Sequence, residues 1–331
     1  MIGGTGSGSG EGSPSRRALG DFSADRRVLT LAGMAVVTGT AASGTAWILL
    51  TLIGFVTNLV WYGRLDTALT SLAGAAPGPS MVAIPVIGAL IVGAMARYGS
   101  EKIRGHGIPE AMEAILIGGS RMSPKVAVLK PLSSAVAIGT GGPFGAEGPI
   151  IVTGGAVGSL FAQFFHLSAG ERKTLLVSGA AAGMTAIFGT PVAAVLLAVE
   201  VLLFEWRPRS LVPVTVGAVT AACWRPALFE AGPLFPFTDN PALPWWGLPA
   251  CALLGVACGL ISGVLTRALY ALEDGFGRLP IHWMWWPALG ALVVGLGGLV
   301  EPRALGVGYD VIRDLLAGHL LAGAVLTILV V

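Results

Sequence analysis

Three segments of the chain combine glycine and proline in an order that could bind an anion. In the first, Gly105-His106-Gly107-Ile108-Pro109-Glu110, glycines precede a proline and a helical pattern follows. Proline near the first helical position needs no hydrogen-bond donor, so a helix beginning here presents unused backbone N–H groups. Those groups and the helix dipole together favour a bound anion. The alternative interpretation is an interfacial turn after Arg104.

The second segment, Gly139-Thr140-Gly141-Gly142-Pro143-Phe144-Gly145-Ala146-Glu147-Gly148-Pro149, repeats this order and adds a carboxylate where the next helix should start. An ionisable residue between apolar spans is costly and indicates function. Backbone N–H groups could hold Glu147 in the position that an anion would otherwise fill, and protonation would release it. Glu147 would then be both gate and proton carrier. The alternative is a glutamate that only complements the helix dipole.

The third segment begins at Phe188-Gly189-Thr190-Pro191 and continues to Glu200 through apolar residues. Glu200 is expected to pair internally or to accept backbone donors, and a structural role is favoured. Glu205 stands beside Trp206, where the chain should leave the membrane. We expect a surface ion pair between Glu205 and Arg207 or Arg209.

The composition predicts that helices crossing a membrane position these segments. The 331 residues are 54% hydrophobic and 11% charged, whereas soluble domains carry about 25% charged residues. A bilayer core about 30 Å thick needs about 20 mostly apolar residues per helix, and the chain offers many such runs. The sequence therefore predicts an all-α, multi-pass membrane protein.

Several function classes are not expected. The net charge of +2 and the scattered basic residues do not indicate a nucleic-acid partner. Neither GxSxG nor HExxH occurs and the histidines are dispersed, so the chain is not expected to be an enzyme. Cys223, Cys251 and Cys258 form no CxxC pair, so we expect them to be packing residues, without a metal or cofactor.

The apolar runs differ widely in length. Those between 149 and 205 are short and separated by glycine and proline, which is typical of broken helices that line a polar site. The runs cover roughly 28–62, 80–97, 124–140, 149–167, 174–188, 191–205, 210–229, 244–271, 284–300 and 315–331.

The domain organisation follows from these runs. Residues 1–25 are expected to be a disordered tail, and the arginines before the first run place the N-terminus in the cytoplasm. Residues 26–230 would form a first membrane subdomain, 231–243 a linker and 244–331 a partial second subdomain. The chain stops at Val331 within an apolar run, which indicates truncation.

The three segments resemble the signatures of the CLC family of chloride channels and chloride–proton antiporters, in its bacterial form. Gly105–Glu110 resembles the family's GSGIPE signature, Gly145–Pro149 resembles GREGP, and Gly189–Glu200 resembles the following segment, which ends in a glutamate. The resemblance implies short, broken and tilted helices in an inverted-repeat architecture whose second half is incomplete. It also implies a homodimer with one pore in each subunit and chloride as the transported ligand.

The same resemblance implies roles for individual residues. Glu147 would be the gating glutamate that competes with chloride and exchanges protons, and Glu200 would match a carboxylate common to the family. The central and inner anion sites would be lined by Gly105, His106, Gly107, Ile108 and Pro109, and the outer ones by Gly145, Ala146, Gly148 and Pro149.

Three departures from the family pattern qualify these roles. His106 replaces the serine whose hydroxyl faces the central anion, so anion choice or pH response could differ. Val201 replaces the internal proton acceptor of many exchangers, which favours a channel unless Glu205 or water substitutes. No match to the later GxFxP-like segment or the pore tyrosine precedes Val331. We expect passage of chloride-like anions, channel-like or proton-coupled; the alternative is a non-conducting fragment with an assembly or interaction role.

Overall fold

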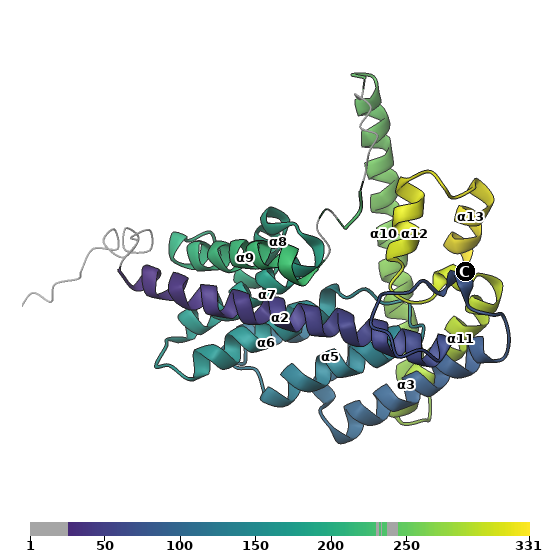
Figure 1. The fold of residues 1–331 in the computed structure, drawn as a ribbon, viewed down its shortest axis with the longest axis horizontal. Coiled ribbons are helices and arrows are strands. Elements are labelled where there is room, and N and C mark those ends of the chain that lie inside the picture. The colour runs from purple at the N-terminus through teal and green to yellow at the C-terminus, as the bar shows by residue number, and fades with distance from the viewer. Residues whose placement is uncertain (1–25, 230–231, 233, 237–243) are drawn as a thin grey trace, which may run out of the picture. The chain divides into compact units, whose positions relative to one another are not determined.

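The computed structural model describes residues 26–229, 232, 234–236 and 244–331 (Figure 1). The predicted tail 1–25 and most of the predicted linker 231–243 lie outside the described residues. The α-helices are α2 (Arg26–Tyr62), α3 (Ser80–Tyr98), α4 (Ile108–Leu116), α5 (Pro124–Gly139), α6 (Glu147–Gln163), α7 (Ala169–Phe188), α8 (Pro191–Ala198), α9 (Pro208–Leu228), α10 (Gly247–Gly277), α11 (Trp286–Val300), α12 (Tyr309–Leu316) and α13 (Ala322–Val330).

Short helical turns supplement these helices. A π-helical segment, Val199–Leu203, follows α8, and four 3-10 turns cover Leu72–Gly74, Glu101–Ile103, Trp283–Trp285 and Pro302–Ala304. No β-strand occurs in the described part of the chain. The predicted all-α fold is therefore confirmed.

Five described helical stretches are long and apolar enough to cross a membrane: Arg26–Tyr62, Ser80–Tyr98, Pro208–Leu228, Gly247–Gly277 and Trp283–Val300. With 37 residues, α2 is about 55 Å long, well beyond the about 30 Å of a bilayer core. In contrast, α4 has 9 residues and α8 has 8, so neither can span a bilayer. The predicted mixture of long spans and short, broken helices is confirmed.

The residues fall into two compact units that alternate along the chain. Unit 1 takes the described residues of 1–47, together with His106–Ala127 and Gly148–Ala231. Unit 2 takes Ile48–Gly105, Val128–Glu147 and the described residues of 232–331. The subdomain division expected from the sequence stays a prediction.

In unit 1, small residues let helices approach closely. A Cβ on Gly154 of α6 would lie 2.4 Å from the carbonyl oxygen of Gly179 on α7, and one on Gly217 of α9 would lie 2.1 Å from Ser178 Oγ. Figure 1 shows α7, α8 and α9 gathered together. Side chains such as Val152, Leu176 and Leu202 fill the core between these helices.

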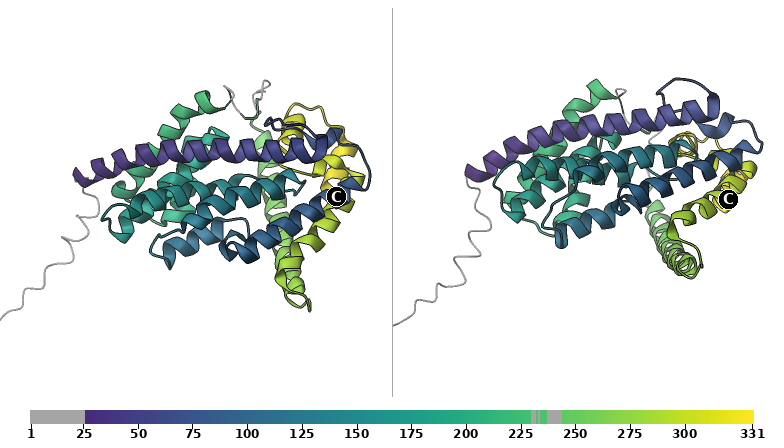
Figure 2. Two further views of the ribbon diagram at one scale, coloured as in Figure 1. Left: turned by 60° about the horizontal axis from the view of Figure 1, so that its bottom comes forward. Right: turned by 90° about the horizontal axis from the view of Figure 1, so that it is seen from below.

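In unit 2, α3 and α11 lie side by side (Figures 1 and 2). A Cβ on Gly295 would lie 2.6 Å from the Val82 Cα, so glycine is required at this crossing. Every residue of α10 from Leu248 to Gly275 is exposed. The cysteines at 251 and 258 lie on this helix and Cys223 on α9; all three are exposed. Their assignment to packing inside the chain was wrong, because an apolar run does not report whether its residues face protein or lipid.

Candidate anion-binding site

The first predicted helix start is confirmed in unit 1. Helix α4 begins at Ile108, with Pro109 in its first turn. Gly107 caps the helix with a φ of +108°, a left-handed conformation that favours glycine. His106, which precedes this cap, is exposed. The local sequence thus dictates a helix start that presents backbone donors, as anion binding requires.

Unit 1 brings the starts of α4 and α6 into direct contact. A Cβ on Gly148 would lie 1.7 Å from the carbonyl oxygen of His106, and one on Gly107 would lie 2.5 Å from Val152 Cγ2. Side-chain carbons do not approach other atoms this closely. Glycine is therefore required at 107 and 148 for the two segments to meet.

Unit 2 contains the residues that lead into α6. Glu147 is the first residue of this helix, and Ala146 before it is buried. The Glu147 carboxylate folds back over Gly145, because a Cβ there would lie 1.7 Å from Glu147 Oε2. The acidic side chain thus lies at the start of its own helix, where the dipole favours a negative charge.

Lys130 on α5 is a buried charged residue next to the first predicted segment, and the sequence analysis missed it. It is 2% exposed, and its ammonium donates to the carbonyl oxygens of Ile103 at 2.9 Å and Gly105 at 2.7 Å. A buried cation in an apolar helix is costly, which makes a functional role a hypothesis to test. Its ammonium therefore lies at Gly105, the first residue of the segment that is predicted to bind an anion. A lysine within the apolar run 124–140 was the signal that could have identified it.

The third helix start is confirmed at Pro191, which begins α8 after Thr190. Glu200 and Val201 lie in the π-helical segment that follows, and Glu200 is exposed. Its role as a structural or proton-path carboxylate stays a prediction.

The predicted ion pair of Glu205 with Arg207 is confirmed, at 3.6 Å between Arg207 Nε and Glu205 Oε2. Lys173 Nζ lies 3.5 Å from Oε1, and the Ser210 hydroxyl donates to Oε1 at 2.7 Å. Burial by itself would raise the pKa of Glu205, but the hydrogen bond from Ser210 and the two cations outweigh it and lower the pKa. Glu205 is thus held in its ionised form.

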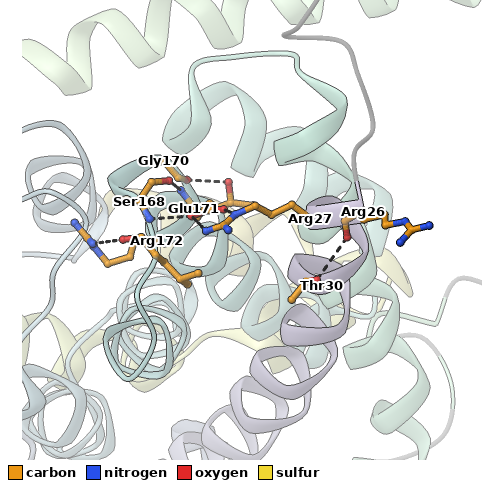
Figure 3. A network of polar contacts seen from close by, with 9 residues as sticks. Arg26, Arg27, Thr30, Ser168, Gly170, Glu171 and Arg172 are labelled. Carbon is orange, nitrogen blue, oxygen red and sulfur yellow. Dashed lines mark hydrogen bonds and ion pairs between the residues drawn. The ribbon is translucent and has the colours of Figure 1, made fainter.

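A second polar network ties α2 to the start of α7 (Figure 3). Arg27 pairs with Glu171 through both carboxylate oxygens. Glu171 also accepts from the Ser168 backbone N–H at 2.8 Å, and Ser168 Oγ accepts from the Glu171 N–H at 3.3 Å, which forms a capping box. The Arg27 hydrogen bond is the main cause that lowers the pKa of Glu171 to about 2. A hollow of about 270 Å³ adjoins this pair, and none of the predicted anion-site residues lines it.

Arg27→Met should lower the melting temperature of the purified protein by about 2 °C at neutral pH, the effect of a partly exposed ion pair. Because the pKa of Glu171 is lowered from 4.5 to about 2, this stabilisation is complete above about pH 4.5 and is lost as the pH falls toward 2. Melting curves of both proteins should therefore converge in acid. Arg26→Met is the control, because Figure 3 shows Arg26 pointing away from Glu171. A difference that persists unchanged in acid would contradict the assignment to this pair.

Comparisons with known proteins agree with the fold and the motifs. The profile of the family described as voltage gated chloride channel matches residues 87–331. The H(+)/Cl(-) exchange transporter ClcA of Cronobacter sakazakii is 30% identical over 245 residues, which cover 68% of this chain and 50% of that protein. The voltage-gated ClC-type chloride channel ClcB of Salmonella typhi is 31% identical over 254 residues, which cover 74% of this chain and 60% of that protein. The chain thus spans half to about three fifths of the length of these curated relatives.

Solved structures share the fold. A slow cyanobacterial Cl-/H+ antiporter superimposes with a TM-score of 0.70 at 20% identity, covering 88% of this chain and 68% of that one. A CLC-type fluoride/proton antiporter superimposes with a TM-score of 0.74 at 18% identity, covering 93% of this chain and 75% of that one. With the family profile matched over most of its length, the chain belongs to the voltage gated chloride channel family.

Proposed function

We propose that this protein moves chloride-like anions across the membrane through a site lined by helix N-termini and gated by Glu147. The observation that carries the proposal is the contact between Gly148 at the start of α6 and the His106 carbonyl that precedes α4. Two helix starts at one place concentrate backbone N–H groups and dipole charge, which bind anions. In unit 1, His106, Gly107, Ile108, Pro109, Gly148 and Pro149 would line this site, and a part for Gly105, Gly145 and Ala146 of unit 2 stays a prediction.

The names of the relatives divide between a channel and an exchanger. Val201, where many exchangers carry a glutamate, favours conduction without obligatory proton exchange. Glu205 does not readily replace the missing proton acceptor, because its pKa is lowered and cations hold it ionised. We therefore propose the channel mechanism ahead of antiport.

The test is anion flux into liposomes with simultaneous recording of internal pH. A channel produces anion flux without a stoichiometric pH change, whereas an antiporter moves anions and protons in a fixed ratio. The alternative function, a non-conducting fragment with a role in assembly, predicts neither flux nor anion binding. Isothermal titration with chloride separates that alternative from a protein that binds anions but is poorly reconstituted.

A multi-pass location in the cell membrane accords with the five candidate spans. We further propose a cytoplasmic N-terminus and a homodimer, in which each subunit carries its own anion site. Cross-linking in native membranes, followed by mass measurement in detergent, tests the dimer.

His106→Ser should remove a pH dependence from anion selectivity. An imidazole is the side chain whose charge commonly changes between pH 5 and 8, and a nearby cation strengthens anion binding by ~1 kcal/mol at 4 Å in water, which is about fivefold. The ratio of chloride to nitrate permeability should vary over this range in the original protein and become constant in the variant. His166→Ser is the control, because that histidine is also exposed but lies in the turn between α6 and α7. Equal pH dependence in all three proteins would exclude a role for His106.

A further inference from the structure

Four residues of unit 2 form a cluster that the proposed function does not use. Arg97 lies in the last turn of α3, and Arg104 follows six residues after that helix ends. His282 and Trp283 lie directly before α11. Arg97, Arg104 and His282 are exposed and Trp283 is half-buried. These four residues are called the basic–aromatic cluster, and all belong to the same unit.

A close backbone approach positions this cluster. A Cβ on Gly93 of α3 would lie 2.4 Å from the Met284 carbonyl oxygen, so glycine is required where the turn Trp283–Trp285 packs on α3. His282 caps that turn, and its Nδ1 accepts from the Met284 backbone N–H at 3.2 Å. On the other side of the ring, His282 Nε2 contacts Arg97 Nη1. The ring is therefore held between a backbone donor and a guanidinium.

The His282 imidazole cannot accept from both of these neighbours. A backbone N–H and a guanidinium are both donors, whereas a neutral imidazole has one nitrogen that accepts and one that carries a proton. In either tautomer, one ring N–H therefore faces another donor instead of an acceptor. An anionic oxygen beside the ring would supply the missing acceptor.

Arg104 brings a second guanidinium to the cluster. Its Cζ lies 4.3 Å from the centroid of the Trp283 ring, a cation–π contact, and that ring lies 5.0 Å from the His282 ring. A guanidinium stacked on a ring still presents its N–H edge, which matches a phosphate in a bidentate contact. Among the residues that the structure describes, neither Arg97 nor Arg104 pairs with a carboxylate.

The cluster lies where a membrane surface is expected. It stands at the ends of two candidate spans, α3 and the stretch Trp283–Val300. Tyr98 and Trp285 beside it are exposed, and tyrosine and tryptophan are enriched at the boundary between membrane and water. Residues 97–104 contain three basic residues and one acidic residue, Glu101. Basic residues in this position attract anionic lipids.

We propose that the basic–aromatic cluster binds the phosphate of an anionic phospholipid. Arg97 and Arg104 donate to the phosphate oxygens, and one of these oxygens accepts the hydrogen bond that the His282 ring leaves unmade. Exposed apolar side chains continue from the cluster along both helices, with Ile91 on α3 and Leu289 on α11. They offer a surface to the acyl chains, which favours a lipid over a soluble anion.

The test is native mass spectrometry of the full chain in detergent, titrated with phosphatidylglycerol. Arg97→Gln and Arg104→Gln should each weaken binding about fivefold, the contribution of one basic side chain near an anionic membrane surface. Arg104→Lys keeps the charge but not the planar group over Trp283, so it should retain part of the affinity. Phosphatidylcholine, whose headgroup has no net charge, should bind more weakly and equally to all these proteins.

Arg64→Gln is the matched control, because Arg64 is also exposed, lies over an aromatic ring, that of Tyr62, and belongs to unit 2. It should keep the original affinity. An equal loss in this control would show a general effect of surface charge and overturn the proposal, as would equal binding of phosphatidylcholine to the original protein. Displacement of the lipid by an equal concentration of inorganic phosphate would identify a soluble anion as the ligand and overturn it as well. None of these measurements depends on anion flux, so their outcome is independent of the proposed function.

Discussion

Glu147→Gln should leave anion flux running and remove its dependence on pH. Glutamine has nearly the shape of glutamate, but it carries no charge and cannot exchange a proton. In the structure the carboxylate folds over Gly145 at the start of its own helix, so it fills the position proposed for an anion. With this competitor neutralised, flux near pH 7 should rise to the value that the original protein reaches only when its carboxylate has left that position.

Flux of chloride into liposomes at a series of external pH values measures this effect. Proton movement, if the original protein shows any, should fall to the background of empty liposomes. Glu113→Gln is the control, because Glu113 lies in the same site-forming region on α4 and is exposed. If Glu147→Gln stopped anion flux altogether while the protein still bound chloride, Glu147 would not be the gate.

The helix starts of this fold could be predicted from local sequence. Pro109 and Pro191 each follow a glycine-containing turn, and the structure begins α4 and α8 at those places. Such starts depend on the missing proline donor and on glycine conformations, which are properties of a few adjacent residues. The π-helical turn of Val199–Leu203 was not predicted, because that distortion depends on packing rather than on local propensity.

The long-range partners of the site could not be predicted in the same way. Lys130 donates to the carbonyls of Ile103 and Gly105. Every residue has a backbone carbonyl, so the sequence does not indicate which carbonyls accept a hydrogen bond from a distant lysine. Hydropathy likewise located α10 but not the exposure of its residues from Leu248 to Gly275, because periodicity does not distinguish lipid from protein as the apolar surroundings.

Gly148→Ala should remove most of the anion flux by separating the two helix starts. The added methyl group would lie 1.7 Å from the His106 carbonyl oxygen and 2.8 Å from its carbon. Both neighbours are backbone atoms, so no side chain can rotate away, and either α4 or α6 must shift. Forcing extra volume into a packed site costs about 1–3 kcal/mol. We expect a lower melting temperature and loss of most of the anion flux.

Gly170→Ala is the matched control in unit 1, because a Cβ at that position in α7 meets no atom within 4 Å. An open helical site should tolerate alanine and gain up to about 1 kcal/mol in stability. Chloride affinity, measured by titration on folded protein, separates a distorted site from a destabilised one. If folded Gly148→Ala bound chloride and conducted it at the original rate, the contact between the two helix starts would not be part of the anion site. Loss of affinity in the folded variant would instead show that anion binding depends on the contact between Gly148 and the His106 carbonyl.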